Sequence, residues 1–225
     1  FQRGVGVSAD GTCAQDTLRA FERLSRSIIG GDSGALREHA SLASLRTGIA
    51  DKVIVIDPGE NVHPELTYAI CVRIEGRLAA LGTQVLLTRP EIPMVHKTQS
   101  THAEFANDMD ADIVISLHLD EVDSPKPNGI SVYYFGLPNG GIHSPGGRIL
   151  AGLINEELIS RTDRKDCLIH ARTWDLLRFT QMPTVRIELG YMSNAGDAKR
   201  LTSEAFHDAV AEGVVAALTT FCSPR

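Results

Sequence analysis

The chain has 225 residues, of which 43% are hydrophobic and 22% are charged, and its formal net charge is −6. This length and composition are typical of a globular protein that can bury a substantial core without covalent staples. The negative charge disfavours a nucleic-acid partner, and no apolar run is long enough to span a membrane. No signal peptide is recognisable, and Phe1 opens the chain in mid-pattern, so we expect a fragment or a processed form.

The first fifty residues divide into two segments with different sequence patterns. Residues 1–29 contain a polar turn and then Leu18, Phe21 and Leu24 at helical spacing, which predicts a short helix. Residues 30–50 lose this periodicity and are rich in glycine, which predicts a linker with at most one weak helix. The main domain is therefore expected at residues 51–222. The four cysteines are far apart and form no CxxC pair, so we expect buried free thiols.

From residue 51 onward, short apolar runs alternate with stretches of helical periodicity. Strands are predicted at residues 53–56, 84–88, 111–117, 129–135 and 184–189. Helices are predicted at residues 66–81, 96–109, 148–161 and 204–221. This alternation predicts an α/β fold in which helices cover both faces of one sheet, with sites beyond the ends of the strands.

Three of the predicted strands end in groups that can do chemistry. The first strand runs into Asp57-Pro58-Gly59-Glu60, the third runs into His118, and the last contains Glu188. His118 could bind a metal, act as a base or be exposed. Glu188 lies among apolar strand residues, where a carboxylate is costly unless it is paired, for example with Arg186, or serves as a general base.

Glu60 and His63 flank the turn after the first strand, and their side chains are compatible with zinc or with simple solvation. The remaining histidines on polar segments, His96, His102 and His143, are expected at the surface. The chain contains no GxSxG, P-loop, GxGxxG or HExxH motif, which excludes the commonest serine-hydrolase, nucleotide-binding and zincin interpretations.

Three segments carry a family resemblance. Residues 52–59 (KVIVIDPG), 111–118 (ADIVISLH) and 182–194 (MPTVRIELGYMSN) resemble, in order and spacing, the signatures of the type 3 N-acetylmuramoyl-L-alanine amidases. The resemblance implies a three-layer sandwich with a mostly parallel, mixed sheet flanked by helices. Residues 1–29 resemble the C-terminal part of a repeat from a small helical peptidoglycan-binding module.

The resemblance also implies a mechanism. One Zn²⁺, held by a histidine, a glutamate and the histidine of the SxH strand, assists hydrolysis of the amide between the muramic acid lactyl group and L-alanine. His118 matches the strand histidine and Glu188 matches the catalytic glutamate. The first signature departs from the pattern, because Glu60 follows the DPG directly and His63 stands at the second ligand position.

Two explanations of this departure stay open. The loop is truncated, leaving either a rearranged zinc site of Glu60, His63 and His118 or no site, or the chain as given lacks a stretch after Gly59. The first function considered is a zinc-dependent amidase of the cell envelope that acts on peptidoglycan or muropeptides. It is preferred here because His118 and Glu188 are both retained.

The second function is a catalytically impaired regulator. Residues 73–82 and 172–185 resemble an actinobacterial branch of the family that is associated with cytoplasmic control of peptidoglycan precursor synthesis. Such a protein would act through contacts with an enzyme of that synthesis. A third, weaker interpretation is a simple peptidoglycan-binding module, for which residues 1–29 are too short to be complete.

Overall fold

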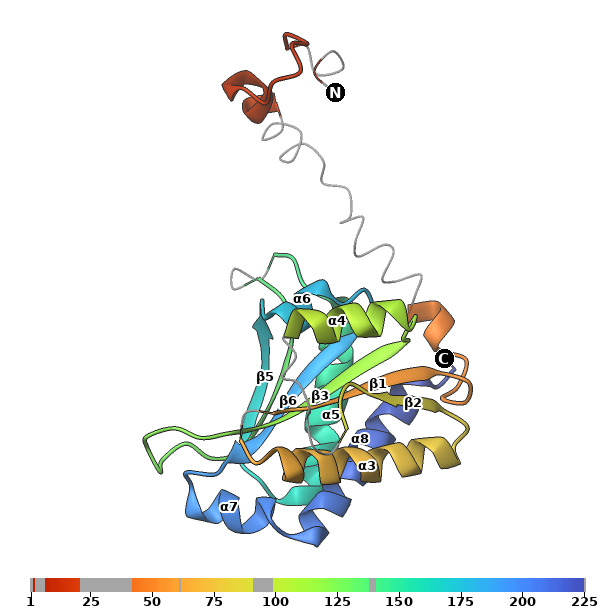
Figure 1. Cartoon of the computed structure of the whole chain (residues 1–225), viewed down its shortest axis with the longest axis vertical. Coiled ribbons are helices and arrows are strands. Elements are labelled where there is room, and N and C mark those ends of the chain that lie inside the picture. Colours follow the sequence, from red (N-terminus) through yellow and green to blue (C-terminus); the bar gives the residue numbers. More distant parts are fainter. Residues whose placement is uncertain are drawn as a thin grey trace. The chain divides into compact units, whose positions relative to one another are not determined.

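The computed structural model describes residues 2, 7–20, 42–60, 62–90, 99–137 and 141–224 (Figure 1). The chain divides into two compact units, Phe1–Leu36 and Arg37–Arg225. The predicted helix positions Phe21 and Leu24, the linker residues 30–41 and His96 lie outside the described residues.

In the N-terminal unit, the side chain of Gln2 organises a polar turn. Its amide nitrogen donates to Asp10 Oδ1 at 3.0 Å and to the carbonyl oxygen of Thr12 at 2.9 Å, while its amide oxygen accepts from the backbone nitrogen of Gly11 at 3.0 Å. Residues 15–20 are helical after this turn. Its assignment to a peptidoglycan-binding repeat stays a prediction.

The second unit is built on one six-stranded mixed sheet with the strand order β2-β1-β3-β6-β4-β5. Neighbouring strands are parallel except β4 and β6, which pair antiparallel. The strands are β1 (Val53–Pro58), β2 (Gln84–Leu87), β3 (Ile113–Asp120), β4 (Ile130–Phe135), β5 (Asp166–Arg172) and β6 (Thr184–Tyr191). The predicted mostly parallel mixed sheet flanked by helices is therefore confirmed.

Among the described residues, helices of at least five residues alternate with the strands of this sheet (Figure 1). They are α3 (Pro64–Ala80), α4 (Gln99–Asp108), α5 (Pro145–Thr162), α6 (Asp175–Phe179), α7 (Ala195–Leu201) and α8 (Glu204–Cys222). None of the helices in the described part of the chain is both long and apolar enough to cross a membrane.

One face of the sheet is an apolar core. Because side chains alternate along a strand, Ile54, Ile115 and Ile187 all point to this face, where they are fully buried. The residues that cover them come from α3, α5 and α8, for example Ile74 and Leu158. Burial of apolar surface on this face supplies the main driving force for the fold.

The opposite face is only partly apolar. A small second cluster joins Val55 and Val114 of the sheet to Ala103 and Ala106 of α4 and to Leu176 of α6. The small alanine side chains allow α4 to lie close to the strands. The positions that continue this face toward the carboxyl ends of β1, β3 and β6 are polar, and they form the candidate site.

The structure adds elements that the periodicity did not predict, namely β5, α6 and α7. Residues 42–50, assigned to the linker from their composition, pack against the domain. Leu42 and Leu45 are buried in the main core, and the backbone nitrogen of Gly48 donates to the carbonyl oxygen of Cys222 at 2.8 Å. All four cysteines are free as predicted, but only Cys71 and Cys222 are buried.

Candidate functional site

The predicted site residues come from strands that are neighbours in the sheet. β1, β3 and β6 are parallel and adjacent, so their carboxyl ends lie at the same edge (Figure 1). Asp57 pairs in register with Ser116, and His118 pairs with Glu188. The sequence-based expectation that His118 and Glu188 converge is therefore met by the strand register.

Asp57 is the centre of a buried hydrogen-bond network. Its Oδ1 accepts from Thr88 Oγ1 at 2.6 Å and lies 2.9 Å from His102 Nδ1, and its Oδ2 accepts from Ser116 Oγ at 2.6 Å. Burial on its own would raise the pKa of Asp57. The hydrogen bond and charge of His102, together with His118 and Ser116, instead hold that pKa well below its usual range. Asp57 is therefore ionised at neutral pH.

The same network fixes the tautomer of His118. Ser116 Oγ has one proton, which it donates to the Asp57 carboxylate, so it must accept from His118 Nε2–H at 2.7 Å. The Nδ1 atom of His118 then carries the lone pair, and it is buried without a hydrogen-bond partner. Burial and the charge of Arg186 lower the pKa of His118 to about 3, so the ring is neutral at pH 7.

Gly59 lies directly against this ring. A Cβ atom at Gly59 would stand 2.6 Å from His118 Nδ1 and 2.6 Å from the carbonyl oxygen of Leu117. The Gly59 backbone nitrogen donates to that same carbonyl oxygen at 2.7 Å. The glycine of the DPG segment is thus required for close approach of two backbones beside the histidine.

Glu188 is held by an arginine from its own strand. Arg186 Nε and Nη2 donate to Glu188 Oε1 at 2.8 and 2.6 Å, which forms the salt bridge considered from the sequence. The guanidinium carbon of Arg186 also lies 4.6 Å from the ring centroid of Trp174. Burial raises the pKa of Glu188 above its usual value, and Arg186 offsets only part of that rise. The second oxygen, Oε2, is buried and has no hydrogen-bond partner.

The other two predicted ligands lie in different surroundings. His63 begins α3 with a left-handed backbone, and its Nδ1 lies 2.9 Å from Glu65 Oε1, both side chains being exposed. Glu60 is largely buried, with its Oε1 3.8 Å from Arg89 Nε. Arg89 also donates to the carbonyl oxygens of Pro58, Gly59 and Pro64. This buried arginine ties the end of β1 to the start of α3.

A catalytic zinc ion needs about three protein ligands in one place. Within the described ranges, no group of three or more His, Cys, Asp or Glu residues is placed to hold a metal. His63 is turned to Glu65. Of the three predicted ligands, His118 has a buried nitrogen without a hydrogen-bond partner, and Ser116 orients its ring as a hydrogen-bonding neighbour orients a metal ligand. As arranged, these residues do not fit a three-ligand site, and the ligand roles of Glu60, His63 and His118 stay predictions.

His102 corrects one sequence-based expectation. It was expected at the surface of a polar helix, yet it is buried and contacts Asp57. Its helix packs on the sheet through Ala103 and Ala106, so the apolar signal that marks a buried helix face is weak here. Arg89 and Ser116 were also missed. Ser116 could have been found, because it lies two residues before His118 and so faces the same side of the strand.

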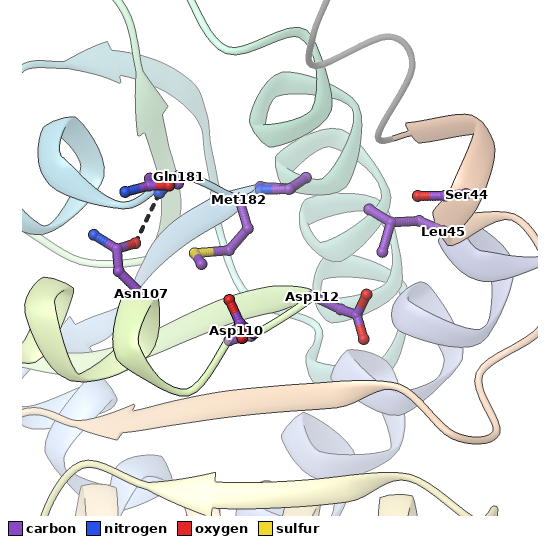
Figure 2. A pocket seen from close by; sticks show the side chains of 9 residues that line it. Ser44, Leu45, Asn107, Asp110, Asp112, Gln181 and Met182 are labelled. Carbon is purple, nitrogen blue, oxygen red and sulfur yellow. Dashed lines mark hydrogen bonds between the residues drawn. The ribbon is translucent and has the colours of Figure 1, made fainter.

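A separate cavity of about 230 Å³ lies at the other end of the sheet. Figure 2 shows its side chains, which come from the segment before β1, the end of α4, the segment before β3 and the segment before β6. The backbone nitrogen of Gln181 donates to Asn107 Oδ1 at 3.0 Å on one side of it. Since Asp112 and Pro183 precede their strands, this cavity is remote from the carboxyl ends that carry His118 and Glu188.

The fold and the edge residues agree with a comparison against protein families. Residues 54–220 match the family described as N-acetylmuramoyl-L-alanine amidase. The chain therefore belongs to the N-acetylmuramoyl-L-alanine amidase family, and its second unit is an amidase-type domain.

Two relatives show which members of the family the chain resembles. The chain is 37% identical to the N-acetylmuramoyl-L-alanine amidase CwlM of Mycobacterium tuberculosis over 97% of its own length and 57% of that protein. It is 23% identical to the amidase LytC of Bacillus subtilis over 76% of its length and 35% of that protein. The chain thus spans between a third and three fifths of these relatives. The predicted resemblance of the chain to CwlM is confirmed.

Solved structures give the same fold. The amidase AmiC2 of Nostoc punctiforme has a TM-score of 0.66 and 25% identity, covering 76% of this chain and 96% of that one. The amidase Ami1 of Mycobacterium smegmatis has a TM-score of 0.69 and 19% identity, covering 78% and 99%. At its low identity the second likeness supports the fold alone.

Proposed function

We propose that this amidase-type domain does not hydrolyse its ancestral bond and instead acts, through protein–protein contacts, on the synthesis of peptidoglycan precursors. The observation that carries the proposal is the pairing of Arg186 with Glu188, the residue that matches the family's general base. The partner would be an enzyme of precursor synthesis, and the place of action would be the cytoplasm. The identity with CwlM supports this choice of branch.

The chemical argument concerns the availability of a base. A general base must be within reach of the proton that it removes and must hold that proton in the transition state. Arg186 donates two hydrogen bonds to Glu188 Oε1, and charge-assisted bonds of this kind favour the ionised carboxylate. Protonating Glu188 would cost both bonds and leave a buried cation without its partner. Burial outweighs Arg186 and leaves the pKa of Glu188 above its usual value, so the obstacle to amide hydrolysis is the occupation of Glu188 Oε1 by Arg186 rather than an inability of the carboxylate to take up a proton.

A second candidate is the zinc-dependent N-acetylmuramoyl-L-alanine amidase that cuts the lactyl amide of peptidoglycan or muropeptides in the cell envelope. The observation in its favour is the adjacency of His118 and Glu188 in register, with the Nδ1 lone pair of His118 oriented by Ser116. The residues that the structure describes do not offer three zinc ligands in one place.

The two candidates are separated by assaying the whole chain. We expect purified protein to release no stem peptide from muropeptides, with or without added zinc, and to behave in this assay like Glu188→Ala. We also expect it to bind an enzyme of precursor synthesis and change that enzyme's rate. Peptide release that depends on zinc and disappears in Glu188→Ala would replace the proposal with the second candidate.

A further inference from the structure

Arg186 occupies a central position on the polar face of the sheet. It lies in register with Ser116 of β3 on one side and with Tyr133 of β4 on the other. Glu188 follows two residues later on the same face, opposite His118. The guanidinium is therefore surrounded by the groups from which the family's catalytic centre is expected.

The side chain of Arg186 is held as a fixed part of this face. It is 13% exposed and makes two hydrogen bonds to Glu188 Oε1. Its guanidinium stacks on Trp174, whose ring centroid lies 4.8 Å from that of Tyr133. Stacking on an aromatic ring suits a guanidinium because this cation is planar and weakly hydrated. The aromatic pair and Glu188 together determine where the positive charge lies.

We propose that Arg186 is the resident cation of this site: it supplies permanently the positive charge that would otherwise come from a metal ion, and it keeps divalent cations out. The inference rests on the proposed non-hydrolytic function and deepens it. A guanidinium stays protonated at any physiological pH, so the compensation of Glu188 never depends on metal supply. A divalent ion beside Glu188 would face this fixed charge at short range. Arg186 acts through Glu188 and is a positioning residue.

The single tryptophan makes the inference directly measurable. Trp174 is the chain's one tryptophan and touches Arg186, so its fluorescence reports on the site. Zinc titrations of the full chain are followed by this emission and by the midpoint of thermal unfolding. We expect the wild-type protein to respond neither to zinc nor to a chelator. In Arg186→Leu, which frees both oxygens of Glu188, we expect zinc affinity to rise by about tenfold or more.

Three further variants test whether a gain of zinc binding in Arg186→Leu comes from the loss of the positive charge beside Glu188. Arg186→Lys keeps the charge and should remain unresponsive to zinc. Arg186→Leu combined with Glu188→Gln removes the carboxylate and should lose the gained affinity. Arg172→Leu removes a neighbouring exposed arginine, which lies over Tyr133 at 5.3 Å, and should leave zinc binding unchanged.

The outcomes are distinct from those that test the function. Zinc binding by the wild-type protein at the affinity of Arg186→Leu, or no gain in Arg186→Leu, overturns the inference even if no peptide is ever released. If Arg186→Leu does not fold, the double variant decides. If the double variant folds and the wild-type protein does not respond to zinc, the result supports the inference that Glu188 requires the charge of Arg186. If the double variant also fails to fold, the result counts against the inference. The proposed function is overturned by different results, namely amide hydrolysis by the wild-type chain or no binding to an enzyme of precursor synthesis.

Discussion

The two faces of the central sheet use the same strands for different purposes. On one face, Ile54, Ile115 and Ile187 are fully buried under α3, α5 and α8. On the other face, the alternate residues include the buried Asp57 and Ser116, which are hydrogen-bonded to each other. The apolar face tolerates any arrangement that fills its volume, whereas the polar face is stable only when each buried group keeps its partner. The two faces should therefore fail in different ways when they are perturbed.

The largest expected difference is in the response to acid. The folded-state pKa of His118 is lowered to about 3 from its usual 6.5, so the unfolded chain binds this proton more readily. The stability that depends on neutral His118 is complete above pH 6.5 and is lost as the pH falls toward 3, by on the order of 4 kcal/mol. Urea unfolding across this range measures it. His118→Asn should flatten the dependence, and an unchanged slope would contradict the assignment.

Deleting volume from the apolar face should cost slightly less. Ile187 is fully buried at the centre of the sheet, so Ile187→Ala should lower the unfolding free energy by about 3 kcal/mol through lost burial and a cavity. This loss should be nearly independent of pH, because no titrating group is involved. Val72→Ala on the exposed side of α3 is the matched control and should change stability by less than about 0.5 kcal/mol. A stability loss in Ile187→Ala that changes with pH would contradict the proposed difference between the two faces.

Adding one methyl group at the polar edge tests the close approach of the backbones. Gly59→Ala would bring a Cβ within 2.6 Å of the Leu117 carbonyl oxygen, which cannot move without distorting β3. We expect a loss of about 2 kcal/mol, measured by thermal or urea unfolding. Gly76→Ala is the control, since a Cβ there meets nothing within 4 Å and Gly76 lies inside α3. Its stability should stay level or rise, because alanine favours helix.

The smallest change concerns a single hydroxyl. Ser116→Ala removes the link between Asp57 and His118 and leaves one buried donor and one acceptor with fewer partners. The expected loss is about 1–2 kcal/mol in unfolding free energy. Because the hydroxyl determines the tautomer of His118, NMR of the ring nitrogens should also show a mixture of tautomers. A single unchanged tautomer would argue that another group orients the ring.

Much of the fold could be predicted from local pattern. The apolar runs at residues 53–56 and 111–117 became β1 and β3, and the periodic stretch at 204–221 became α8. These segments are predictable because their apolar residues are all buried in one core. β5 escaped prediction since it is an edge strand with mixed burial, and α6 escaped because it has only five residues.

The candidate site was predictable only in part. His118 and Glu188 stand at strand positions that a sequence can indicate, and parallel strands bring their ends together. The burial of His102 and the role of Arg89 depend on segments that meet through the fold, so no local pattern marks them. The predicted ligands Glu60 and His63 are only three residues apart in sequence, yet they do not share a site. Glu60 lies near Arg89, whereas His63 contacts Glu65.

By itself, the sequence determined the family, the alternating strands and helices, and the presence of a histidine and a glutamate at neighbouring strand ends. It could do so because these features follow from residue order and from the two-residue period of a strand. Only the tertiary structure decided what those groups do to one another. Arg186 and Glu188, like Ser116 and His118, are two residues apart on one strand, so the strand period alone brings each pair together. Packing of other segments buries these pairs and adds Asp57, His102 and Trp174, and the charge and tautomer of a buried group depend on such neighbours.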